Sequence, residues 1–131
     1  MGQQQLLLII LGVIIVGIAV AVGITMFQDN AESANRDAVT NDLVQLAAKA
    51  QQFYRKPASL GGGSNTFTGL TMASLVSSAF SNNDNGQYSV TANAGTSISF
   101  QGVGKTALSG GGFPTVNCVV TGVGYTISIV N

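Results

Sequence analysis

The first 27 residues contain an apolar run that is almost uninterrupted. Leu6 to Phe27 is 22 residues long, and Thr25 is its only polar side chain. About 20 apolar residues are enough for a helix to cross the hydrocarbon core of a bilayer. Because a backbone in lipid must satisfy its own hydrogen bonds, the run is predicted to be a helix despite its many β-branched residues.

From Gln28 to Lys56 the pattern becomes amphipathic. Carboxylates gather in the first half of this stretch and basic residues at its end, as the helix dipole favours. The charges are expected to form a solvated face. The apolar residues recur every three or four positions, which is typical of one face of a helix, at Val39, Leu43, Leu46, Ala47, Ala50, Phe53 and Tyr54.

The two patterns join without a helix-breaking residue. No Pro or Gly lies between Ile24 and Lys56, and Pro57 then ends the helix. One helix is therefore predicted from about Gln3 to Arg55, with a length of about 80 Å at 1.5 Å per residue.

The residues after Pro57 predict a small β-rich domain. Ala58 to Thr68 is rich in Gly, Ser and Asn and is predicted to be a loop, whereas Leu70 to Phe80 is predicted to be one short helix packed on the domain. Asn82 to Gly86 predicts a turn, and Thr121 to Gly124 a hairpin. Strands are predicted from period-2 alternation of the apolar residues Tyr88, Val90, Ala92, Ile98, Phe100, Val116, Cys118, Val120, Tyr125, Ile127 and Ile129.

The predicted fold class is α+β. A long N-terminal helix, half apolar and half amphipathic, packs on an antiparallel sheet of about four strands. The predicted division is a helical region, residues 1–56, and a globular domain, residues 57–131. Since about 75 residues are marginal for an independent core, the helix must supply part of it. The predicted helix–sheet core includes Val39, Leu43, Leu46, Ala50, Phe53 and Tyr54.

The composition limits the kinds of partner and functional site that are expected. Five basic residues balance five acidic ones, which argues against nucleic acid as a partner. The chain has no His and a single Cys. Without His the commonest general base and metal ligand is missing, so no catalytic, metal or cofactor site is predicted. The carboxylates from Asp29 to Asp42 are expected on an exposed helix without a partner base. Cys118 is expected to be a buried hydrophobe.

A phosphate-binding loop is rejected. Gly104-Lys105-Thr106 matches the end of that motif, but Ser99 stands where its first Gly is required.

The uncharged C-terminal half leaves two hypotheses about its surface. Eight of the ten charged residues lie between Asp29 and Lys56, so little charge remains to keep this half soluble. Its surface is expected to be buried against neighbouring copies or covered by sugars on Ser and Thr.

Three glycines lie within the apolar segment. Gly12, Gly17 and Gly23 either reflect the ordinary abundance of Gly in membrane helices or allow local loosening of the helix outside lipid.

The apolar segment lacks the features of a cleaved signal peptide. No basic start precedes the run and no small-residue cleavage site follows Phe27, so the segment is expected to stay in the mature protein.

This organisation resembles the type IV pilin family. Ala47-Ala48-Lys49-Ala50-Gln51-Gln52-Phe53-Tyr54-Arg55 is similar to the end of the long helix in pilins and pseudopilins. The resemblance implies a subunit stored in the cytoplasmic membrane, trimmed by a prepilin peptidase and extruded by an ATPase-driven machine. It implies an extracellular helical filament of many copies whose core contains Leu6, Leu7, Ile10, Leu11, Val13, Ile14, Val16, Ile18, Val20, Val22, Ile24 and Phe27.

The sequence departs from the family at the N-terminus. The residues at the implied processing site are Gly2 and Gln3, but Met1 stands where a basic residue usually precedes the Gly. The family's glutamate at the fifth mature position is replaced by Leu7 if the chain starts at Gln3, or by Gln5 if it starts at Met1. The lone Cys118 has no partner for the family's usual C-terminal disulfide.

The expected function is structural rather than enzymatic: the major subunit of a type IV pilus-like filament. Three alternatives remain open. The chain could be a pseudopilin of a type II-like secretion system, a subunit of an archaeal adhesion filament, or a single-pass membrane-anchored binding module.

Overall fold

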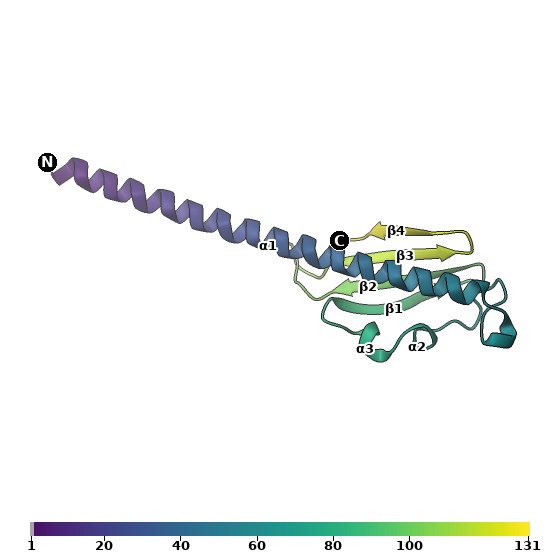
Figure 1. The fold of residues 1–131 in the computed structure, drawn as a ribbon. Helices are drawn as coiled ribbons and strands as arrows, with labels where there is room; N and C mark the ends of the chain where they lie inside the picture. Colours follow the sequence, from purple (N-terminus) through teal and green to yellow (C-terminus); the bar gives the residue numbers. More distant parts are fainter. Residues whose placement is uncertain (1) are drawn as a thin grey trace. The chain divides into compact units, whose positions relative to one another are not determined.

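A computed structural model describes residues 2–131, and its first element is the predicted long helix. Helix α1 spans Gly2–Arg55 and is followed by Lys56 and Pro57 (Figure 1). The chain forms two compact units: the first ends at Ala31, and the second runs from Glu32 to Asn131. The amphipathic end of α1 therefore belongs to the same unit as the β-strands.

The connection from α1 to the sheet contains three short helical turns. The 3-10 helix η1 spans Ala58–Leu60, α2 spans Met72–Leu75 and α3 spans Ser78–Ser81. The prediction of a single short helix from Leu70 to Phe80 is therefore wrong, because the stretch forms two separate helical turns. Val76, between them, is extended, with φ −145° and ψ 160°. Thr71 and Ser74 close a capping box that starts α2, in keeping with the preference of Ser and Thr for helix ends.

Four antiparallel strands follow, as predicted, and the structure arranges them in simple meander order. They are β1 (Gly86–Asn93), β2 (Ser97–Gly104), β3 (Thr115–Thr121) and β4 (Tyr125–Ile129), and the sheet order is β1-β2-β3-β4. The predicted hairpin joins β3 to β4, where the Thr121 N–H donates to the Gly124 carbonyl at 2.7 Å. The α+β fold class is thereby confirmed.

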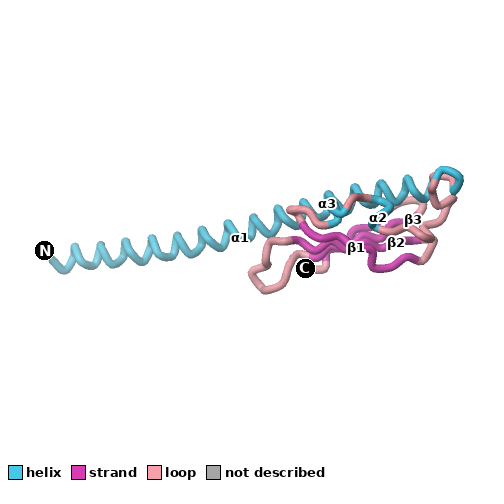
Figure 2. Tube along the Cα trace, turned by 90° about the horizontal axis from the view of Figure 1, so that it is seen from below, coloured by secondary structure: helices cyan, strands magenta, loops and turns pink. Residues whose placement is uncertain are grey.

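The core of the second unit lies between α1 and one face of the sheet (Figure 2). On this face the side chains of Ile98, Phe100, Val116, Cys118 and Val120 are fully buried. Helix and sheet approach closely at Gly102, where an added Cβ would come within 2.7 Å of Val39 Cγ1. Of the predicted helix–sheet core, four residues are fully buried and two are partly buried against it, namely Val39, Leu43, Leu46 and Ala50, and Phe53 and Tyr54.

Candidate functional surfaces

The largest candidate surface is the apolar part of α1. Its large apolar side chains between Leu6 and Phe27 are 52–77% exposed, and they include all twelve residues proposed above for a filament core. Thr25, the one polar side chain, donates its hydroxyl to the Ala21 carbonyl at 3.1 Å, so the helix itself satisfies it. The helix is long and apolar enough to cross a membrane. The segment thus has the chemistry of a membrane anchor or of the interior of an assembly.

The glycines and the implied processing site lie on the same helix. α1 is helical through Gly12, Gly17 and Gly23, and an added Cβ at any of them would meet nothing within 4 Å. Their loosening outside lipid stays a prediction. Gly2 and Gln3 are in the first turn of α1, whereas Met1, the alternative mature start, lies outside the described residues.

A buried carboxylate is the main polar feature of the second unit. Asp42 is only 7% exposed, and its Oδ2 accepts hydrogen bonds from Tyr88 Oη at 2.5 Å, Asn83 Nδ2 at 3.0 Å and Asn85 Nδ2 at 3.1 Å. Asn35 Nδ2 reinforces the same junction by donating to the Asn85 carbonyl at 2.9 Å. These bonds attach α1 to the turn that leads into β1.

The expectation that all the charges of α1 form a solvated face is therefore wrong for Asp42. A carboxylate is costly to bury unless donors replace its water, and three donors do so here. Asp42 follows Val39 by three positions and precedes Leu46 by four, so its helical spacing already indicates the core-facing side. The arrangement is structural, since Tyr88 is itself 5% exposed and leaves little room for a substrate at this carboxylate.

The Asp42–Tyr88 contact predicts a loss of stability in alkali. Burial, followed by the hydrogen bond to Asp42 and the negative charge of that carboxylate, raises the pKa of the Tyr88 phenol above its usual value. As the pH rises above about 10, the unfolded chain therefore loses this proton while the folded chain retains it. The free energy of unfolding should fall with pH over this range, and Tyr88→Phe should remove that part of the slope. Urea denaturation of the full chain in detergent at pH 9 to 11 measures both slopes, and equal slopes would contradict the prediction.

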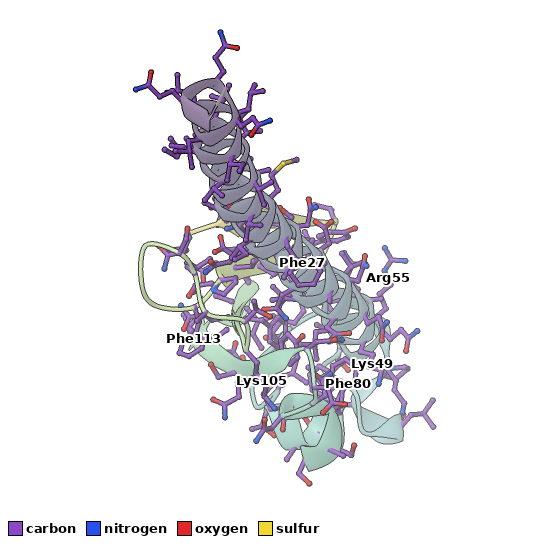
Figure 3. All side chains as sticks on the ribbon, turned by 90° about the vertical axis from the view of Figure 1, so that its left-hand side faces the viewer. Phe27, Lys49, Arg55, Phe80, Lys105 and Phe113 are labelled. Carbon is purple, nitrogen blue, oxygen red and sulfur yellow. The ribbon has the colours of Figure 1, made fainter. Side chains whose placement is uncertain are left out.

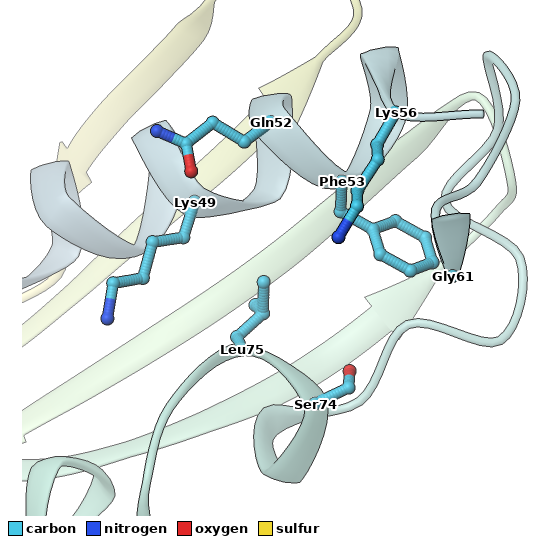
Figure 4. Close-up of a pocket in the computed structure, with 7 residues that line it drawn as sticks. All are labelled: Lys49, Gln52, Phe53, Lys56, Gly61, Ser74 and Leu75. Carbon is cyan, nitrogen blue, oxygen red and sulfur yellow. The ribbon is translucent and has the colours of Figure 1, made fainter. Parts of the chain in front are cut away.

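The first pocket lies between α1 and α2 (Figure 4). It measures about 270 Å³, and its walls come from Lys49, Gln52, Phe53, Lys56, Gly61, Ser74 and Leu75. Lys49 Nζ also lies 5.4 Å from the centre of the Phe80 ring (Figure 3). The two Lys side chains supply positive charge that suits a small anionic ligand, and the seven lining residues include no carboxylate, thiol or imidazole.

A second pocket lies where β1, the end of β2 and the loop after β2 meet. It measures about 420 Å³ and is lined by Gln87, Val103, Gly104, Lys105 and Phe113. Lys105 and Phe113 lie on the segment that joins β2 to β3 (Figure 3). The Thr106 N–H points to Asn35 Oδ1 at 3.3 Å, so the Gly104-Lys105-Thr106 sequence belongs to a strand end and loop rather than to a strand-to-helix phosphate cradle.

Cys118 is a buried residue of β3, as predicted. Its side chain is 0% exposed, and burial raises the pKa of the thiol to about 11. Because the thiolate is the reactive form, iodoacetamide at pH 8 should modify the native chain at least about 100-fold more slowly than the urea-unfolded chain. The increase in intact mass with time measures both rates. Comparable rates would mean that the thiol is accessible in the native protein.

Neither a metal site in the described residues nor similarity to a known protein indicates the function. Within residues 2–131 no three His, Cys, Asp or Glu side chains converge as metal ligands would. No protein-family model matches the sequence, and no curated protein and no solved structure is significantly similar to it. The architecture is nevertheless pilin-like, with a long N-terminal helix, apolar in its first half, packed on a small antiparallel sheet.

Proposed function

We propose that this protein is the major structural subunit of an extracellular, type IV pilus-like helical filament. The supporting observation is the exposed segment from Leu6 to Phe27, which is uncharged and continuous with a helix that forms part of a folded domain. About 22 apolar residues suit lipid before assembly and an apolar bundle after it. The role is structural and requires no catalytic group or cofactor.

Assembly also explains the surface of residues 57–131. Only Asp84 and Lys105 carry charge in this region, so it lacks the mixed charges that keep a free monomer soluble. In a filament much of this surface faces neighbouring copies. The proposed partners are further copies of the chain, the cytoplasmic membrane before assembly, and the prepilin peptidase and assembly ATPase of the pilus machinery.

A single-pass membrane-anchored binding module is the second candidate. The observation that favours it is the pocket beside Lys49 and Lys56, which has the charge to hold an anion. In this alternative the apolar helix would remain in lipid, and the folded domain would present the pocket.

Electron microscopy of material sheared from producing cells separates the two functions. Mass spectrometry of the same material identifies the chain and its N-terminal residue. Thin uniform fibres built from this chain support the filament, and a first residue of Gln3 supports processing after Gly2. Retention of the chain in the membrane fraction, with none in sheared fibres, would reject the filament in favour of the anchored module.

A further inference from the structure

Strand β4 carries apolar side chains on the core side of the sheet that the chain itself covers only in part. The register pairs Tyr125, Ile127 and Ile129 with Val120, Cys118 and Val116, and paired residues point to the same face. The three β3 residues are fully buried, whereas Tyr125 is 46% and Ile129 is 60% exposed, and Ile127 is half-buried. Tyr125, Ile127 and Ile129 are called the β4 stripe below.

The dimensions of the elements explain why this stripe stays open. A helix is about 10 Å wide and strands lie about 4.8 Å apart, so one helix covers about two strands of a four-stranded sheet. On the β1 side, α3 extends the cover, since Phe80 packs on Tyr88 with ring centres 5.9 Å apart (Figure 1). No element performs this role on the β4 side within the described part of the chain.

The two edge strands of the sheet, β1 and β4, also differ in how well they are protected against pairing with another strand. On β1 the register shifts between Val90 and Ala92, which is a bulge of the kind that disrupts pairing with another strand. The pairing of β4 is regular, and from Thr121 to Asn131 there is no Pro and no charged residue. Since soluble proteins normally protect such an edge, the β4 side has the features of a surface that an assembly covers.

We propose that the β4 stripe binds the apolar helix segment, Leu6 to Phe27, of a neighbouring copy of this chain. The inference rests on the proposed filament and names the surface that receives the helix. Both surfaces are apolar and exposed in the single chain, and neither has a charged residue of its own; Arg36 of α1 reaches only the end of β4, where its Nε donates to the Asn131 carbonyl at 3.0 Å. The stripe continues the buried layer of β2 and β3, so the neighbour's helix would extend an existing core.

The geometry of such a contact also favours a filament. The two surfaces are different parts of the chain, so a copy that offers its helix to one neighbour keeps its stripe free for another. A contact between unlike surfaces produces a ring or an open helical assembly, whereas self-complementary patches close into dimers.

The first test places a charge on the stripe. Ile129→Lys should lower the yield of sheared fibres by about tenfold or more, because the ammonium would be buried without a partner. Ser128→Lys is the matched control: it adds the same charge to the neighbouring residue of β4, on the opposite face of the sheet, and should leave the yield near that of the wild type. Near-UV circular dichroism of both variants in detergent verifies that the domain has folded. A folded Ile129→Lys chain with wild-type fibre yield would overturn the proposal.

The second test detects the contact directly and does not depend on a charged variant. Cells express two forms of the chain: one carries a photo-crosslinking phenylalanine analogue at position 129, and the other is marked in mass by Val22→Ile. Since no Lys or Arg precedes Arg36, trypsin releases the apolar helix as one peptide. In fibres, position 129 should crosslink to the mass-marked helix peptide, and position 128 should not. Crosslinks from position 129 only to other peptides would refute the docking.

The two proposals fail in different ways. If the wild-type chain is absent from fibres, the filament itself is rejected and the docking with it. If wild-type fibres form but Ile129→Lys matches Ser128→Lys in yield, or the crosslink misses the helix, only the docking of the helix on the β4 stripe is rejected.

Discussion

Val13→Asp should abolish fibres while leaving the folded domain intact. Val13 is 67% exposed in the single chain and lies in the apolar part of α1, so assembly of the proposed filament would bury it in every copy. A carboxylate placed in such an apolar interior finds no donor and is costly. A cost of about 3 kcal/mol for each added copy lowers the association constant by about two orders of magnitude. Fibre yield, measured by electron microscopy and mass spectrometry of sheared material, should therefore drop below detection.

Two comparisons make the result specific to assembly. Val13→Ile keeps the apolar character and should retain fibres. Ile15→Lys should behave as Val13→Asp does, which would show that charge of either sign, and not the shape at one position, is responsible. The amount of each variant in the membrane fraction separates lost assembly from lost insertion. A Val13→Asp chain that enters membranes and yields fibres at the wild-type level would refute a filament core built from this segment.

The helix and the sheet were predictable because strong local patterns specify them. The uninterrupted apolar run, followed by a three- and four-residue repeat up to Pro57, predicts α1 almost to the residue. Alternation along Tyr125, Ile127 and Ile129 likewise predicts β4 and groups these three side chains together, whereas only the register shows that they share the face of Val116, Cys118 and Val120. The single short helix predicted over Leu70 to Phe80 was wrong, because the extended backbone at Val76 divides the stretch into two separate turns, a change too short for apolar periodicity to resolve.

Tertiary partners were the part that the sequence alone did not reveal. Asp42 was assigned to the solvated face because it is charged, although its spacing places it beside Leu43 and Leu46. Its donors come from more than 40 residues further along the chain, and only the folded structure brings them together. For the same reason alternation assigned the β4 residues to a face but could not show that α1 is too narrow to cover them.

Asp42→Ala should destabilise the domain by about 3 kcal/mol, a large share of the 5–15 kcal/mol typical of a folded domain. Truncation removes the acceptor of the Tyr88 hydroxyl and of the Asn83 and Asn85 side-chain amides, and all three donors lie in partly or fully buried positions. Leaving a buried donor without a partner costs about 1–3 kcal/mol. Urea denaturation of the full chain in detergent, followed by near-UV circular dichroism of its tyrosines, reports on the folded domain and gives the difference.

Matched variants test whether this loss of stability is specific to the Asp42 carboxylate and its hydrogen bond from Tyr88. Asp37→Ala removes an exposed carboxylate from the same helix and should change the stability by no more than about 0.5 kcal/mol. Asp42→Asn keeps an oxygen acceptor without the charge and should fall between the two. Combining Asp42→Ala with Tyr88→Phe should cost less than the sum of the single changes, because both remove the same hydrogen bond. If Asp42→Ala is no more damaging than Asp37→Ala, the junction between α1 and the β1 turn does not depend on this carboxylate.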